Sequence, residues 1–109
     1  MTISALQELY ICIRRFPKQD RHTLGQKSQQ LTLEILELLF TANSAFGVER
    51  FNTQKQIDLK LKILKIVIRL SHDVRAIDQK HYLALEEKLV EIGRMLGGWM
   101  KTNKKTPDL

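Results

Sequence analysis

The sequence predicts an all-α protein with the architecture of an antiparallel up-down four-helix bundle. Apolar residues recur at the three-to-four-residue period of a helix over four long segments. The 109-residue chain contains only 5 glycines and 2 prolines, which leaves few breaks. Pro17 and Pro107 lie near the ends of the periodic region, and no segment shows the two-residue period of a strand. Short links between helices of similar length favour up-down connections.

The first two helices are expected on either side of a polar connection. The first covers about Ile3–Phe16, because Pro17 disfavours helical geometry at the preceding residue. The second begins within residues 20–23 and ends near Ala45. Gly47 then provides a C-terminal stop signal.

The last two helices are expected to be separated by a very short connection. The third covers about Gln54–Ala76, with Asn52 or Thr53 as its N-cap. The fourth covers about Gln79–Thr102, with Asp78 as its N-cap.

The third helix carries apolar residues on an unusually broad arc. They form two lines: Ile57, Leu61, Leu64 and Ile68 on the first, and Leu59, Ile63, Ile66 and Leu70 on the second. A face of this width usually packs against more than one neighbour.

The composition indicates one folded domain inside the cell. We expect residues 1–102 to form the bundle and residues 103–109 to form a disordered basic tail. The single cysteine, Cys12, excludes an intramolecular disulfide framework and fits a reducing compartment. Met1 is followed by neither a signal-peptide pattern nor an apolar run long enough for a membrane span. A cytoplasmic location is therefore expected.

The residues needed for catalysis or metal binding are not grouped in the sequence. The three histidines, His22, His72 and His81, lie apart and lack the spacing of metal ligands. The consecutive residues 71–73, Ser-His-Asp, point in different directions on a helix and cannot form a triad. His72 is expected at the solvated surface. We therefore predict no enzymatic activity and no cofactor.

The basic residues favour a polyanionic partner. The net charge is +6 and the pI is about 9.7. Lys55, Lys62 and Arg69 recur every seven residues, with Lys65 alongside, and we expect this strip opposite the apolar arc. The candidate nucleic-acid-binding residues are Arg14, Arg15, Lys18, Arg21, Lys55, Lys62, Lys65, Arg69 and Arg94. Aromatic residues do not alternate with them, which favours contacts to the phosphate backbone over base stacking.

The string EIGRMLGGW, residues 91–99, places three glycines within a helix. Each costs about 0.5–1 kcal/mol relative to alanine, so a close approach of another backbone is expected. Gly93 is expected to pack against the first or second helix. Gly97 and Gly98, with Trp99 and Met95 as anchors, are expected to form an interface with another subunit.

Three strings carry a resemblance to a known family: FPK and TLGQ within residues 16–26, YLALEEKLVEIG at 82–93 and the glycine-rich string at 91–99. Together they resemble the accessory variability determinant (Avd) proteins of diversity-generating retroelements. The resemblance implies a homopentameric barrel of four-helix bundles with a positively charged surface. It also implies a non-catalytic role in mutagenic cDNA synthesis, with the reverse transcriptase and its template RNA as partners.

Two alternative functions remain open at the level of the sequence. The related ribosomal-RNA intervening-sequence proteins share the fold, and a protein of that type would act as an oligomeric scaffold of unknown role. A plain oligomeric scaffold could also carry its basic charge for solubility alone. A neighbouring reverse-transcriptase gene with a template and variable repeat would favour the Avd reading.

Overall fold

The structure is a computed structural model of the chain and describes residues 3–14 and 21–105. Its elements are α1 (Ile3–Ile13), the π-helical turn η2 (Arg21–Gly25), α2 (Gln26–Ser44), α3 (Gly47–Asp73) and α4 (Gln79–Lys105). These described ranges contain no strand.

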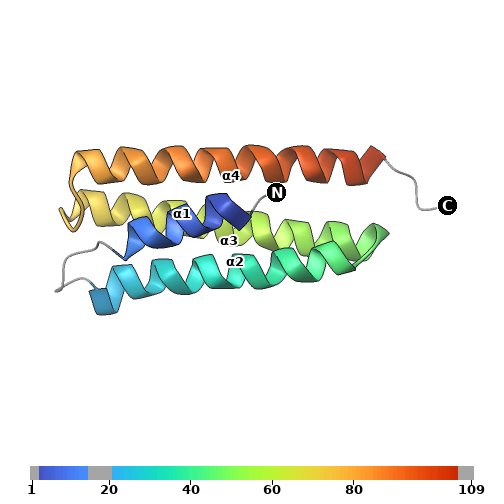
Figure 1. Cartoon of the computed structure of the whole chain (residues 1–109), viewed down its shortest axis with the longest axis horizontal. Coiled ribbons are helices and arrows are strands. Elements are labelled where there is room, and N and C mark those ends of the chain that lie inside the picture. The colour runs from blue at the N-terminus through green and yellow to red at the C-terminus, as the bar shows by residue number, and fades with distance from the viewer. Residues whose placement is uncertain (1–2, 15–20, 106–109) are drawn as a thin grey trace.

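Four helices pack along one another in alternating directions (Figure 1). Each helix packs against the next in sequence, and α1 also packs against α4. This order places α1 diagonally across the bundle from α3. The protein measures 52 × 21 × 21 Å. The predicted antiparallel up-down bundle is confirmed.

The first helix is much shorter than the others. α1 has 11 residues and α3 and α4 have 27 each, which corresponds to about 16 Å against about 40 Å. α1 therefore covers the groove between α2 and α4 only at the end where those two helices begin (Figure 1). Phe16, the expected end of the first helix, lies outside the described residues, and α1 ends at Ile13.

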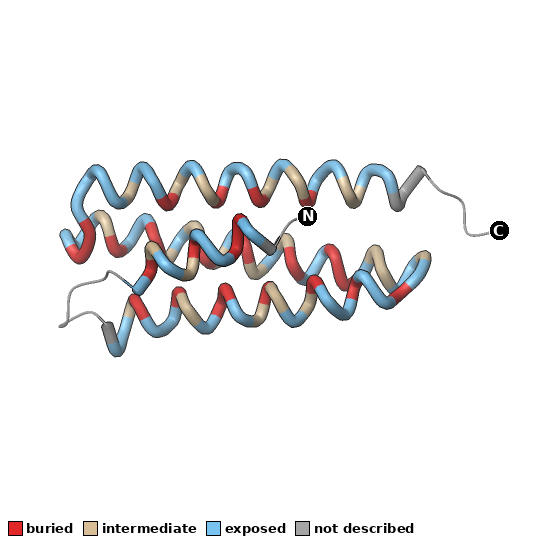
Figure 2. Tube along the Cα trace, in the orientation of Figure 1, coloured by how far each residue is buried: buried red, intermediate tan, exposed pale blue. Residues whose placement is uncertain are grey.

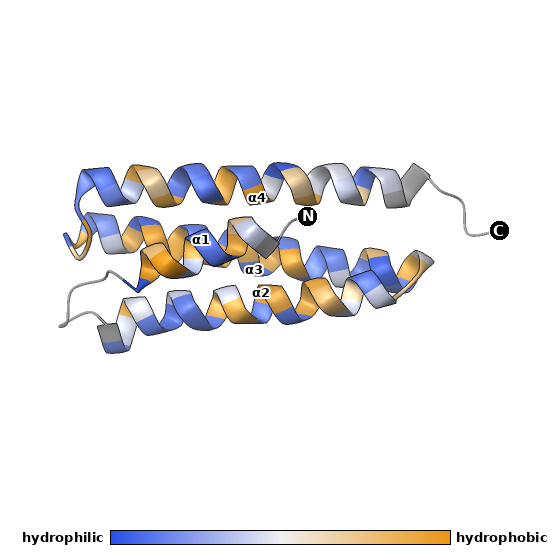
Figure 3. Cartoon of the chain, viewed as in Figure 1, coloured by the Kyte–Doolittle hydropathy of each residue, from blue (hydrophilic) through white to orange (hydrophobic). Residues whose placement is uncertain are grey.

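The core lies along the bundle axis, where buried residues recur on the inner face of every helix (Figure 2). The first apolar line of α3 is central to it, since Ile57, Leu61, Leu64 and Ile68 are all at most 2% exposed. Apolar segments recur along α1, α2 and α3 at the spacing that the sequence predicts (Figure 3). Burial of each large apolar side chain contributes about 1.5–3 kcal/mol, so this line accounts for much of the stability.

Two ion pairs join neighbouring helices at the surface. Lys60 of α3 lies 3.5 Å from the carboxylate of Glu34 of α2. Lys88 of α4 pairs with Glu8 of α1, and the hydrogen bond that the Lys88 ammonium donates to the Glu8 carboxylate raises the pKa of Lys88. The second pair fastens the short α1 to α4.

The connection between α2 and α3 is shorter than the sequence predicts. α3 begins at Gly47 rather than Gln54, so only two residues separate the helices. Gly47 accommodates the change of direction between the two helices, because its φ of 60° lies in the left-handed region that glycine adopts without strain. Thr53, which was expected to cap the helix, instead donates its hydroxyl to the carbonyl of Glu49 within α3.

Arg50 holds this corner together. Its Nε donates to the carbonyls of Ala42 and Ala45 at 3.0 and 2.9 Å, and Nη2 reaches that of Asn43 at 3.4 Å. These carbonyls belong to the end of α2, where backbone acceptors lack helical partners. The guanidinium also lies over the rings of Phe46 and Trp99, at 5.7 and 5.8 Å from their centroids. One side chain of α3 thus caps α2 and contacts α4.

The connection between α3 and α4 ends one helix and starts the next with local hydrogen bonds. α3 ends at Asp73 rather than near Ala76. Arg75 has a φ of 61°, and the N–H groups of Arg75 and Ala76 donate to His72 and Ser71 in a Schellman motif.

Asp78 is the N-cap of α4, as predicted. Its Oδ1 accepts from the backbone N–H of His81 at 2.8 Å and lies 2.7 Å from Nδ1 of the His81 ring. The backbone hydrogen bond is the main reason why the pKa of the Asp78 carboxyl is lowered. α4 then continues to Lys105, past the expected end at Thr102, and residues 106–109 lie outside the described part of the chain.

Removal of the Arg50 side chain, with its hydrogen bonds to the end of α2, should destabilise the fold. Hydrogen bonds from a charged group contribute about 1.5–3 kcal/mol, so we expect Arg50→Ala to lower the unfolding free energy by that amount and Arg50→Lys by less. Urea unfolding followed by circular dichroism measures both. Arg94→Ala, at an exposed position, is the control and should change stability by less than about 0.5 kcal/mol. Equal midpoints of urea unfolding for Arg50→Ala and wild type would show that the Arg50 side chain does not stabilise this corner.

The cap at Asp78 should make stability depend on pH. Because its pKa is lowered in the folded chain, the charged carboxylate contributes fully above the pKa of the unfolded state. That contribution is lost as the pH falls through the lowered pKa. Asp78→Asn keeps an N-cap acceptor without the charge, so we expect it to be less stable than wild type at neutral pH and equally stable in acid. If the difference in stability between Asp78→Asn and wild type stayed the same at low pH, the charge of Asp78 would not be its cause.

Candidate nucleic-acid interface

Three cations form a row along one edge of α3. Lys55, Lys62 and Arg69 are all exposed and follow one another at seven-residue intervals, which makes the row about 21 Å long. We call these three residues the cation row. Its length and exposure suit contacts with several successive phosphates.

Neighbouring side chains hold two members of the cation row without burying their charge. The Lys55 ammonium lies 5.5 Å from the centroid of the Phe51 ring. Lys62 pairs with Asp58 at 2.9 Å within α3. An exposed pair of this kind is worth little, so an incoming phosphate can replace the carboxylate at small cost.

Lys65 extends the basic surface towards α4. Its ammonium lies 3.8 Å from the point that a Cβ on Gly93 would occupy, so the lysine reaches across to the fourth helix. Arg94, the next residue, is exposed. The structure thus brings Lys65 to the Gly93–Arg94 segment, which the sequence alone did not place beside α3.

The remaining predicted basic residues belong to the segment around the connection between α1 and α2. Arg14 follows α1, which lies diagonally across from α3, and is exposed. Arg15 and Lys18 lie outside the described residues. Arg21 begins η2. Along the chain, the predicted set is therefore divided between α3 and α4 and the segment around the connection between α1 and α2.

The four predicted interface residues of α4 do not share one face. Gly97 and Gly98 are exposed, and a Cβ at either would meet nothing within 4 Å among the described residues. Met95 and Trp99 are half-buried and pack against the core of their own chain. Gly93 faces α3, since a Cβ there would lie 3.5 Å from Leu61, and the expected packing against the first or second helix is wrong.

The predicted placement of the cations opposite the apolar arc of α3 is wrong. Most of the second apolar line lies at the surface: Leu59, Ile66 and Leu70 are 58%, 67% and 47% exposed, whereas Ile63 is half-buried and packs against the core. Lys55 precedes Leu59, and Lys62 precedes Ile66, by four residues, so these pairs are neighbours on the helix surface. We call Leu59, Ile63, Ile66 and Leu70 the outer apolar row; it runs directly beside the cation row.

The titratable residues near the α3–α4 connection serve structure. His72 is half-buried rather than solvated. Its ring stacks on Tyr82, with centroids 4.3 Å apart, and its Nε2 lies 2.7 Å from Oε1 of Gln79. Ser71 is buried and donates its hydroxyl to the carbonyl of Val67.

Within residues 3–14 and 21–105, no three His, Cys, Asp or Glu residues gather as they would around a metal ion. None of the helices in those ranges has a stretch both long and apolar enough to cross a membrane.

The similarity of the chain to a known protein family decides which family it belongs to. The model of the bAvd-like family matches residues 2–103, nearly the whole chain. The chain belongs to the bAvd-like family. The resemblance to Avd proteins drawn from the sequence strings is thereby confirmed, and Avd-like proteins are of an accessory, non-catalytic type. No curated protein and no solved structure matched this bAvd-like chain.

The glycines of α4 provide a test of packing within the chain. Because a Cβ at Gly97 or Gly98 meets nothing, we expect Gly97→Ala and Gly98→Ala each to raise stability by about 0.5–1 kcal/mol. Gly47→Ala should instead lower it by about 1–2 kcal/mol, because φ there is positive. Urea unfolding measures all three variants. A destabilisation at Gly97 that grows with protein concentration would show α4 packed against a second copy there.

Proposed function

We propose that this protein is a non-catalytic accessory protein of a diversity-generating retroelement. In the cytoplasm it binds the reverse transcriptase and the template RNA through its basic surface and so supports mutagenic cDNA synthesis. Family membership supports the accessory role. As the resemblance implies, the proposal includes self-association, with a homopentamer as the expected assembly.

The exposed cation row is the observation that carries the proposal for RNA. Lys55, Lys62 and Arg69 present three charges along one edge, and Lys65 and Arg94 extend the surface towards α4. Each phosphate that such a cation neutralises releases counterions, which gives affinity that falls with salt. Contacts of this kind recognise the RNA backbone and its shape rather than its sequence.

The ring of Phe51 supports a backbone-directed mode of binding. It is half-buried and already lies under the Lys55 ammonium. Stacking platforms for single-stranded RNA need an accessible aromatic face. The edge of α3 therefore presents charge rather than rings to the partner.

The decisive experiment is a salt titration of RNA binding. We expect the triple variant Lys62→Glu, Lys65→Glu and Arg69→Glu to lose most of its affinity for structured template RNA. The slope of log affinity against log salt should fall by about two to three units if each cation neutralises one phosphate. Pull-down with the purified reverse transcriptase tests the protein partner in parallel.

The control reverses the same number of charges elsewhere. Lys27, Lys80 and Lys101 are exposed and lie outside α3, so their triple change to glutamate alters the net charge equally. We expect it to reduce RNA binding only slightly. If both triple variants lost the same amount of RNA affinity, the attraction would not be localised to α3. If the wild-type protein bound neither RNA nor the reverse transcriptase at low salt, the accessory function would be refuted.

A further inference from the structure

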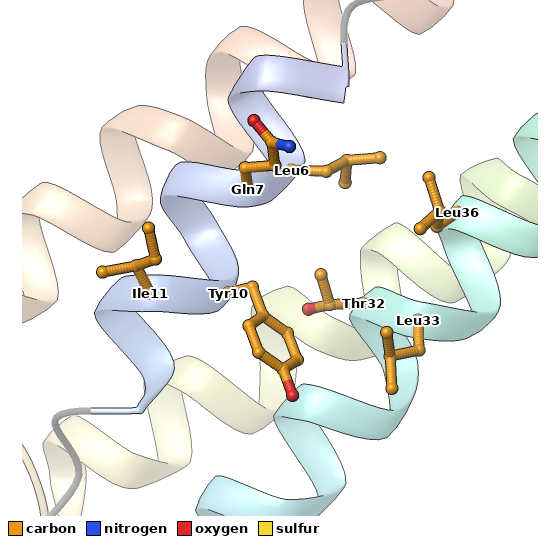
Figure 4. A pocket seen from close by; sticks show the side chains of 7 residues that line it. All are labelled: Leu6, Gln7, Tyr10, Ile11, Thr32, Leu33 and Leu36. Carbon is orange, nitrogen blue, oxygen red and sulfur yellow. The ribbon is translucent and has the colours of Figure 1, made fainter.

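Two apolar surfaces of this chain differ in what lies beside them. One is an open groove of about 310 Å³ between α1 and α2, whose lining includes Leu6, Tyr10 and Leu36 (Figure 4). Every side chain that lines this groove is uncharged. The other surface is the outer apolar row of α3, which runs beside the cation row. Because charge and apolar surface occur together only at the second of these two, the outer apolar row specifies the chemistry of a partner more closely than the groove does.

The outer apolar row lies nearly opposite the buried side of α3. At 3.6 residues per turn, it is about 160° around the helix from the first apolar line at 57–68. Leu59 and Ile66 are more than half exposed and Leu70 is nearly half exposed, whereas Ile63 between them packs against the core. The row is about 16 Å long. It therefore presents accessible side chains over about three turns of a rigidly held helix.

The outer apolar row and the cation row fit one heptad register. The members of the apolar row are spaced four, three and four residues apart, which is the spacing of the a and d positions in a coiled-coil seam. With Ile63 and Leu70 at a, and Leu59 and Ile66 at d, the three residues of the cation row occupy successive g positions. Residues at e and g flank a seam and select the partner helix by charge. Basic residues at g are complementary to carboxylates at the flanking positions of a partner.

A second copy of this face does not supply those carboxylates. The e positions beside the row hold Lys60 and Val67, and Lys60 already pairs with Glu34 of α2. In a parallel pair of two copies the g cations would face these e residues, and in an antiparallel pair they would face one another. Within α3, Lys62 pairs with Asp58, and an exposed pair of this kind is replaced at small cost. The charges therefore favour an acidic partner over self-pairing.

A helix complements this face better than RNA or a lipid surface does. RNA phosphates would neutralise the cation row but would leave Leu59 and Ile66 in contact with water. A helix that lies on a membrane inserts a broad apolar face. The outer apolar row has only the a and d positions of a narrow seam, which is the geometry of helix-to-helix packing.

We propose that the outer apolar row is the docking site for an acidic amphipathic helix of another protein. The partner helix packs leucine-like side chains into the seam and aligns glutamate or aspartate with the cation row. This inference goes beyond the proposed function, because it assigns a protein ligand to a face whose apolar part RNA does not complement. Since the cation row also belongs to the proposed RNA surface, the helix and RNA compete for it.

The first test measures binding of a synthetic peptide by fluorescence anisotropy. The peptide has about three heptads, with leucine at a and d and glutamate at both e and g, so its carboxylates meet the cation row in either orientation. One control peptide has lysine in place of every glutamate, and the other has glutamine in place of every leucine. We expect the protein to bind the acidic leucine peptide at least about tenfold more tightly than either control, with an affinity that falls as salt is added.

The second test removes the apolar row without changing charge. Leu59→Gln with Ile66→Gln should weaken binding of the acidic peptide by at least about tenfold and leave RNA binding unchanged. Both positions are exposed, so the helical fold should persist, and circular dichroism checks this. Ile66→Gln alone, at the more exposed of the two positions, is the milder variant.

Two double variants with comparably exposed apolar positions are the matched controls. Leu83→Gln with Val90→Gln changes α4, and Ile11→Gln with Leu33→Gln changes the α1–α2 groove. Both should bind the acidic peptide as wild type does.

The third test reverses the charge beside the seam. Lys62→Glu with Arg69→Glu should exchange the preference, so that the lysine-flanked peptide binds more tightly than the glutamate-flanked one. Lys27→Glu with Lys101→Glu makes the same change in net charge at exposed positions outside α3. This control should keep the wild-type preference, which separates contact at the cation row from general attraction.

Four results would overturn the inference. Wild type could bind the acidic peptide no better than the control peptides, the row variant could bind it as tightly as wild type, or the groove variant could lose binding that the row variant keeps. In the fourth, wild type binds vesicles of phosphatidylglycerol and phosphatidylcholine through the row and does not bind the peptide, which would assign the face to lipid. RNA binding is measured separately on the same samples. Wild type that binds the peptide but not RNA would refute only the RNA part of the proposed function.

Discussion

A helix of a four-helix bundle can bury one stripe of side chains, and α3 carries two. The line from Ile57 to Ile68 faces inward and is almost completely buried, and α2 and α4 pack on either side of it. The outer apolar row is consequently forced to the surface together with the cation row beside it. The arrangement of core, basic edge and exposed apolar row thus follows from the choice of which line of α3 faces inward. Burial of the inner line makes that choice, because it lies at the centre of the bundle where all four helices converge.

The ends of the helices depend on a small number of polar side chains. Arg50 supplies donors to the last turn of α2, and Asp78 supplies an acceptor to the first turn of α4. Both satisfy backbone groups that a helix leaves without partners at its ends. These contacts make short connections between long helices feasible, and they keep α3 in fixed register between its two neighbours. The basic edge of α3 therefore has a rigid support.

Much of this architecture could be predicted from local sequence patterns, and the errors concern contacts between distant residues. Helical periodicity gave the four helices, and Asp78 at the start of α4 is recognisable as a cap. The predicted start of α3 was wrong because Asn52 and Thr53 resemble N-caps. In the structure the break between α2 and α3 lies at Gly47, and it is set by the positive φ of Gly47 and by Arg50, which reaches back to α2. The neighbour of Gly93 and the exposure of the outer apolar row depend on which helices are adjacent. Periodicity shows that a side chain lies on a stripe, but only the packing order shows which stripe is covered.

The shortness of α1 has a consequence for how the molecule opens. α1 is fastened by the pair of Glu8 with Lys88 and by a few buried side chains along its length, whereas α3 is held from both sides over its whole length. Local opening therefore costs least at α1, and its amide hydrogens should exchange with solvent well before those in the middle of α3.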